Sequence, residues 1–282
     1  MSRHPGENRG PVFPHQQTLF QYPARAWLLC LLALFAVSAV PVEVRSQNNH
    51  AGVTHAVTNA VEEARKAGVP DEAVNRLLSL GYDNAVEAPS MANLVSIVGL
   101  VKKEGLPLEP FLDKIKEGMA KRVPASSIEQ VLKQKEQDYL FARSVTADYL
   151  KKHRVKQEVA PEDLVGIAES LHSGLSREDL SFTMEQAPAA SISALRRVIH
   201  LKASLKQVEF DPKLSDRIVS AALEYDFFAR ERRGFCRAIV AGKRKGIADA
   251  EIAGAALSTM QNGGTVAGFC SQMGISISDI GL

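Results

Sequence analysis

A short pattern of apolar and polar positions recurs along this chain: glycine, apolar, proline or small, any residue, acid, any residue, apolar. Clear copies begin at Gly68, Gly105 and Gly174, and looser ones begin at Gly246, Arg122 and Glu158. Glycine commonly ends a helix, proline is tolerated in the first turn of the next, and an acid there is favoured by the helix dipole. The pattern predicts an all-α fold, an irregular array of antiparallel helix hairpins. The unequal intervals between copies exclude a regular solenoid with one fixed period.

The apolar spacing between these turns predicts individual helices. Residues 90–103 are apolar nearly all round, which indicates a central helix buried on several sides. A long helix follows Pro124 to about residue 154, with Lys135 interrupting its apolar stripe and a cationic end that suits the helix dipole. Gly118 lies within the helix before it, where a small residue lets another helix approach closely.

These elements predict a helical domain over residues 53–262, undivided or split into two subdomains near residues 154–160. Residues 40–52 are polar and contain a proline, so we expect a linker. Residues 263–282 are rich in glycine and serine, so we expect a flexible tail with at most one short helix, near residues 266–273.

The N-terminus predicts export. Ala26 begins a run of 15 residues without charge, AWLLCLLALFAVSAV, which suits the apolar region of a signal peptide better than a spanning helix. We expect residues 1–39 to be a signal peptide cleaved after Ala39, which places the protein in the periplasm or outside the cell. The alternative is an uncleaved anchor over residues 26–44, which would hold the chain at the inner membrane facing the periplasm.

Removal of residues 1–39 changes the charge balance. That segment carries three of the 34 basic and one of the 32 acidic residues, so 31 of each sign are left. Nucleic-acid binding needs a basic surplus that releases counterions. We therefore expect no nucleic-acid partner, and contact with a membrane only through residues 26–44 if the signal is not cleaved.

The stretch KIKEGMAKRVPASSIEQVL, Lys114 to Leu132, resembles a motif of uncharacterised secreted bacterial proteins. The shared features are a lysine–glutamate–glycine turn, a valine–proline step and an amphipathic helix. Arg122 stands where the motif has glycine. The resemblance implies a bacterial envelope setting and brings no activity with it.

Glu169 is the one acid that resembles a catalytic residue. Glu169 and Ser170 resemble the Glu-Ser pair of lytic transglycosylases, which use one glutamate as a general acid. The glycine-rich Met-Gln stretch that those enzymes carry downstream is missing after Ser170. Glu169 is therefore the candidate for a peptidoglycan-active enzyme, and a solvated helix surface is the alternative.

A basic cluster near the C-terminus could bind anionic lipid headgroups, an acidic polymer or an acidic protein surface. Its members are Arg230, Arg232, Arg233, Arg237, Lys243, Arg244 and Lys245, with Glu231 as the one acid among them. The alternative is neutralisation by nearby acids, namely Glu224, Asp226, Asp249 and Glu251, or a simple solvated helix end.

Cys236 and Cys270 are the two cysteines left after cleavage, and in an oxidising compartment they could form a disulfide. Equally, each could be a buried small hydrophobe. The histidines show no metal-binding spacing, so we expect no metal site and no cofactor.

Together these features favour a non-enzymatic interaction or scaffold protein of the bacterial cell envelope, whose partner is another protein or an envelope component. The alternative is a peptidoglycan-active enzyme with Glu169 as its general acid.

Overall fold

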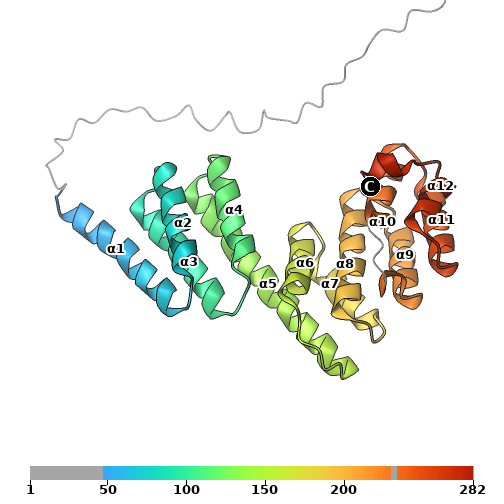
Figure 1. The fold of residues 1–282 in the computed structure, drawn as a ribbon, viewed down its shortest axis with the longest axis horizontal. Helices are drawn as coiled ribbons and strands as arrows, with labels where there is room; N and C mark the ends of the chain where they lie inside the picture. The colour runs from blue at the N-terminus through green and yellow to red at the C-terminus, as the bar shows by residue number, and fades with distance from the viewer. Residues whose placement is uncertain (1–46, 230–233, 282) are drawn as a thin grey trace, which may run out of the picture. The chain divides into compact units, whose positions relative to one another are not determined.

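The computed structural model describes residues 47–229 and 234–281. Within them the fold is all-α, as predicted, with α-helices, two short 3₁₀ helices and no strand (Figure 1). The α-helices are α1 (Gln47–Lys66), α2 (Asp71–Asp83), α3 (Ala88–Lys103), α4 (Glu109–Ala120), α5 (Ala125–His153), α6 (Pro161–His172), α7 (Arg177–Gln186), α8 (Ile192–Gln207), α9 (Pro212–Glu224), α10 (Phe235–Arg244), α11 (Asp249–Gln261) and α12 (Val266–Gln272). The 3₁₀ helices are η1 (Phe227–Ala229) and η2 (Ile277–Ile280). The predicted signal peptide or anchor lies outside the described residues.

The predicted glycine turns are present and share one geometry. All four glycines of the pattern have positive φ: +88° at Gly68, +70° at Gly105, +99° at Gly174 and +79° at Gly246. In the first of these turns the Val69 N–H donates to the Ala64 carbonyl, at 3.0 Å. This bond satisfies a carbonyl at the helix end, as in the Schellman motif. The glycine and the apolar residue after it therefore end one helix, and the next helix begins two or three residues later.

The same turn also occurs where the left-handed residue is not glycine. The sequence pattern included one such turn, at Arg122, and missed another, at Glu209. Arg122 and Glu209 have φ of 55° and 52°, and each precedes an apolar residue whose N–H closes the turn. The looser copy at Glu158 is misplaced, because the left-handed residue is Arg154, with φ of 53°. There the Val155 N–H donates to the Leu150 carbonyl, at 3.0 Å.

Helix α3 is central, as its all-round apolarity predicts. It packs against α1, α2 and α5. Its contact with α1 is close at Gly99, where an added Cβ would lie 3.2 Å from the Ala64 backbone. Gly118 has the predicted role in α4, since a Cβ there would lie 2.8 Å from two side-chain carbons of Ile128 on α5.

Residues 46–282 form one compact unit with two hydrophobic cores that meet along α8. Leu195 and Ile199 belong to the core of the preceding helices, whereas Val198 and Leu201 belong to the core of the following ones. Accordingly α8 packs against α6 and α7 and also against α9 and α10. Helix α8 therefore contributes side chains to both cores, and the subdomain division near residues 154–160 stays a prediction.

Two segments expected to lie outside the helical domain contain helices. Part of the linker expected over residues 40–52 belongs to α1, which begins at Gln47. The tail contains α12, the short helix expected near residues 266–273, and also η2. Its side chains Phe269, Met273 and Ile275 are buried in the second core. These apolar residues anchor the tail despite its glycine and serine content. None of the described helices combines the length and apolarity that crossing a bilayer requires.

Candidate functional site

Glu169 lies in a buried polar cluster between α5 and α6. Its carboxylate forms an ion pair with the Lys135 ammonium, and the Tyr139 hydroxyl donates to Glu169 Oε1 at 2.9 Å. The Lys135 side chain is 3% exposed and that of Glu169 is 37% exposed. The ammonium also lies 5.8 Å from the ring centre of Phe111 and 5.3 Å from that of Tyr139. Lys135 interrupts the apolar stripe because it spans the core to reach this carboxylate, and α5 continues unbroken.

The electrostatics of the cluster oppose general-acid catalysis. Burial is the largest influence on Glu169 and raises its pKa, but the hydrogen bond and charge of Lys135, with help from Tyr139 and His172, outweigh it. The net pKa of Glu169 is lowered. A general acid needs a raised pKa so that it carries a proton near neutral pH. The neighbouring Ser170 hydroxyl donates to the Gly166 carbonyl within α6, at 2.9 Å. The ion pair of Lys135 with Glu169 therefore joins α5 to α6, whereas the Ser170 hydroxyl is engaged within α6.

The basic cluster near the C-terminus is partly neutralised. Arg230, Arg232 and Arg233 lie outside the described residues. Lys243 Nζ lies 2.5 Å from Asp249 Oδ1, and Lys245 Nζ lies 2.5 Å from Asp279 Oδ2. The first of these pairs bears out the expected neutralisation by Asp249. The pairing of Lys245 with Asp279 joins α10 to η2, in the segment expected to be flexible.

The remaining two arginines of the cluster face an open pocket of about 520 Å³, bounded by α8, α10 and η2. Arg237 and Arg244 are exposed, and Lys245 lines the same pocket. Arg237 Nη1 makes one long hydrogen bond, 3.4 Å, to the Gly281 carbonyl. Arg244 has no ionic or hydrogen-bonding partner within the described ranges 47–229 and 234–281. The pocket therefore offers two arginines that no acid within the described residues neutralises.

The wall of this pocket contains Cys236, His200 and Ser204. Burial raises the pKa of the Cys236 thiol to about 12, with a hydrogen bond from Ser204 acting weakly in the opposite direction. Desolvation of the His200 ring and the charge of Arg196 lower the pKa of His200. These wall residues are thus neutral near pH 7. Lys245 is paired with Asp279, which also lines the pocket, so the unpaired positive charge of the pocket comes from Arg237 and Arg244.

The two cysteines considered for a disulfide are free thiols in the structure. Cys236 is half-buried on α10, and Cys270 is buried on α12 within the second core. This matches the alternative in which each serves as a small hydrophobe. Within the described residues no three acid, histidine or cysteine side chains gather as metal ligands.

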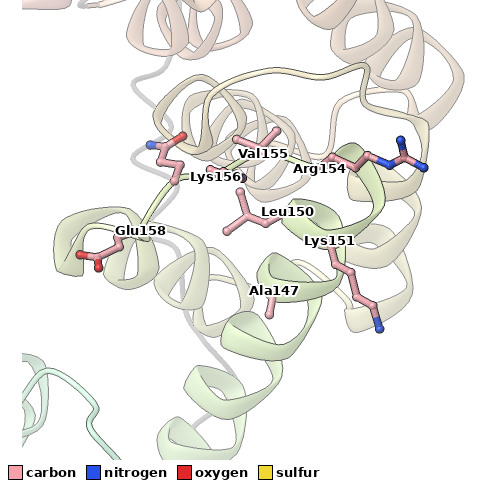
Figure 2. A pocket seen from close by; sticks show the side chains of 8 residues that line it. Ala147, Leu150, Lys151, Arg154, Val155, Lys156 and Glu158 are labelled. Atoms are coloured by element: carbon pink, nitrogen blue, oxygen red, sulfur yellow. The ribbon is translucent and has the colours of Figure 1, made fainter.

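The sequence interpretation missed a second basic surface, at the C-terminal end of α5. An open groove of about 620 Å³ lies there, formed by the last turns of α5 and the segment after it. Figure 2 shows Leu150 and Val155 near its middle, with Lys151 and Arg154 extending outward on one side and Glu158 lying on the other. The sequence signal was the run of cations from residue 151, which we attributed to the helix dipole alone.

No family model matches the chain, and no curated protein or solved structure shows significant similarity to it.

Proposed function

We propose that this chain is a non-enzymatic interaction protein of the bacterial cell envelope that holds anionic groups of its partner. The observation that carries the proposal is the pocket between α8, α10 and η2, where Arg237 and Arg244 are exposed without an acidic partner among the described residues. Exposed arginines in a pocket suit carboxylates or phosphates, because the planar guanidinium binds both oxygens of such groups at once.

The register of α10 supports this role. Arg237 and Arg244 are seven residues apart, so they lie on one helix face about 10 Å apart along the axis. Val240 and Ala241 lie between them on the same face and line the pocket. The face therefore presents a cation at each end of a short apolar stretch, which suits a partner that carries two anionic groups.

The pairs beside the arginines hold this face in place. Lys243 is tied to Asp249 at the start of α11, and Lys245 is tied to Asp279 in η2. Because these lysines are engaged, their neutralisation would disturb the structure as well as the charge. Arg237 and Arg244 are the residues whose substitution separates binding from folding.

The enzymatic alternative has weaker support, because Glu169 is paired with Lys135 and its pKa is lowered. A zymogram with purified protein tests it directly. Clearing of peptidoglycan that disappears in Glu169→Gln would overturn the interaction proposal in favour of a peptidoglycan-active enzyme.

The proposal is tested by fractionation of cells that express the full chain. Arg237→Gln/Arg244→Gln should release several-fold more protein from the envelope fraction than wild type, and added salt should have the same effect on wild type. The matched control is Lys213→Gln/Arg217→Gln, two exposed cations on α9, which should fractionate as wild type does. Equal retention of both variants would contradict the proposal.

Sequencing the N-terminus of the recovered protein tests the location. A mature end near Val40 supports export with cleavage, and an intact leader supports the anchored form. A protein found only in the cytosolic fraction would contradict both.

A further inference from the structure

The groove at the end of α5 combines an apolar floor with a basic rim. Arg154 takes the left-handed conformation, so the chain turns back and places Val155 against the last turns of the helix. Ala147, Leu150 and Val155 form the apolar part of the lining. Its volume of about 620 Å³ falls within the range of ligand pockets, about 300–1,000 Å³. An apolar side chain can therefore be accommodated here.

The rim of the groove carries uncompensated positive charge. Lys151, Arg154 and Lys156 are exposed and line it, and Glu158 is its one acid. None of the three cations forms an ion pair with a described residue. The neighbouring Lys152 differs, because its ammonium donates to the Glu185 carbonyl at 2.8 Å. The charge of the rim is thus free to meet carboxylates.

The segment after the turn offers backbone groups as well. Residues 155–160 belong to no helix, and within the described residues the N–H groups of 156–159 have no hydrogen-bond acceptor. A peptide in extended conformation carries both backbone donors and acceptors and can pair with such a segment. A lipid headgroup on an acyl chain has no comparable row of groups. The backbone therefore favours a peptide over a membrane surface.

We infer that this groove binds an acidic, extended peptide segment of a partner protein, with one large apolar side chain on Leu150 and Val155 and flanking carboxylates at Lys151, Arg154 and Lys156. This surface lies at the end of α5 and involves none of the residues of the α10 pocket. Peptide binding in the groove would be a second kind of partner contact. This inference does not depend on whether the α10 pocket mediates envelope association.

The test is fluorescence anisotropy with the purified chain and a labelled pentapeptide, Glu-Glu-Leu-Glu-Glu. The matching peptide with glutamines in place of glutamates should bind at least five-fold more weakly, and so should the acidic peptide at 500 mM salt. Lys151→Gln/Lys156→Gln should weaken binding of the acidic peptide at least five-fold. The control Lys116→Gln/Lys133→Gln removes two exposed cations elsewhere, on α4 and α5, and should leave binding unchanged.

Two further measurements address the backbone and the alternative ligand. N-methylation of the peptide at alternate residues removes donors without touching the protein, and it should weaken binding several-fold. Equal affinity for both peptides, or equal loss in the control variant, would overturn the inference. So would binding to phosphatidylglycerol vesicles that depends on Lys151 and Lys156 while the peptide does not bind.

Discussion

The side chain of Arg196 on α8 lies directly across Gly166 on α6. A Cβ at position 166 would lie 2.8 Å from Arg196 Cγ and still closer to Cδ. By crossing this glycine the guanidinium reaches Asp163, with Nε 2.9 Å from Oδ1. The contact is an ion pair without hydrogen-bond alignment, since Arg196 Nε has no hydrogen-bond partner. Because Gly166 has no side chain, Arg196 can cross it and form an ion pair with the buried Asp163.

Replacement of this glycine should be destabilising. In Gly166→Ala the Arg196 side chain must move, and the buried Asp163 then loses its counter-charge. We expect the free energy of unfolding in urea to fall by roughly 1–3 kcal/mol. The control is Gly254→Ala, at an exposed site on α11 with open space around it, which should gain up to about 1 kcal/mol. A neutral or stabilising Gly166→Ala would show that Arg196 relocates without cost.

The pair of Lys135 and Glu169 should behave as a structural unit. Glu169→Gln leaves a buried ammonium without its counter-charge, and we expect a loss of about 1–3 kcal/mol in unfolding free energy. Addition of Lys135→Met should recover part of that loss, and a double-mutant cycle measures the coupling. Glu162→Gln, at an exposed site on the same helix, should have little effect. If the losses of unfolding free energy in the two single variants add up to the loss in the double variant, Lys135 and Glu169 do not interact.

Asp179 should make stability depend on pH in the acid range. Burial is its largest influence and raises its pKa, but hydrogen bonds from Lys206 and Ser176 and the charge of Lys202 outweigh it, so the pKa falls from 3.8 to about 2. A lowered folded-state pKa stabilises the fold above the unfolded value, and this contribution disappears as the pH falls from about 4 to about 2.

We therefore expect the Asp179→Asn variant to lose stability at pH 6 and to show a flatter decline between pH 4 and pH 2. Urea midpoints across this range provide the measurement. Asp113→Asn, which removes an exposed acid on α4, should follow the wild-type curve. Parallel curves for Asp179→Asn and wild type would exclude the predicted role of Asp179.

Arg122 should be replaceable by glycine with a gain in stability. Its φ of 55° is the left-handed conformation that the pattern fills with glycine elsewhere. An ordinary residue there costs roughly 1–2 kcal/mol. Thermal unfolding of Arg122→Gly should show a gain of about 1 kcal/mol, reduced by the greater freedom of glycine in the unfolded chain. Gly105→Arg, the reverse change at the matching turn, should lose a similar amount.

The two cysteines should react as free thiols of low reactivity. With its pKa near 12, Cys236 is protonated at pH 8, and Cys270 is buried. Iodoacetamide should label neither quickly in the folded protein and both in denaturant without a reductant, as peptide mapping reports. Labelling that requires a reductant would instead identify a disulfide.

The turns were predictable because their signals are local. A helix end, a left-handed residue and an apolar residue are adjacent in sequence, so Gly68 and Gly174 predicted their turns directly. The same argument failed at Glu209, because no glycine marks the left-handed position there, although the Phe210 N–H closes the turn onto the Leu205 carbonyl. The Phe210 side chain is buried in the second core.

The candidate sites were less predictable because their partners are distant in sequence. Lys135 and Glu169 are separated by 34 positions, as are Lys245 and Asp279. Nothing in the spacing of either residue indicates its partner. The basic cluster was recognised as a charge run. Among its described residues, Lys243 and Lys245 are paired with acids and Arg237 and Arg244 are not, and this difference depends on the packing of α10 against α11 and η2.

Because α8 contributes to both cores, the binding of a partner at one core should affect unfolding of the other. A helix that completes both interiors cannot unravel without opening each of them. A partner that binds only the folded form stabilises, by its binding free energy, every part of the chain that unfolds in the same cooperative step. Occupancy of the α5 groove should therefore slow proteolysis at sites beyond α8 that the partner never touches.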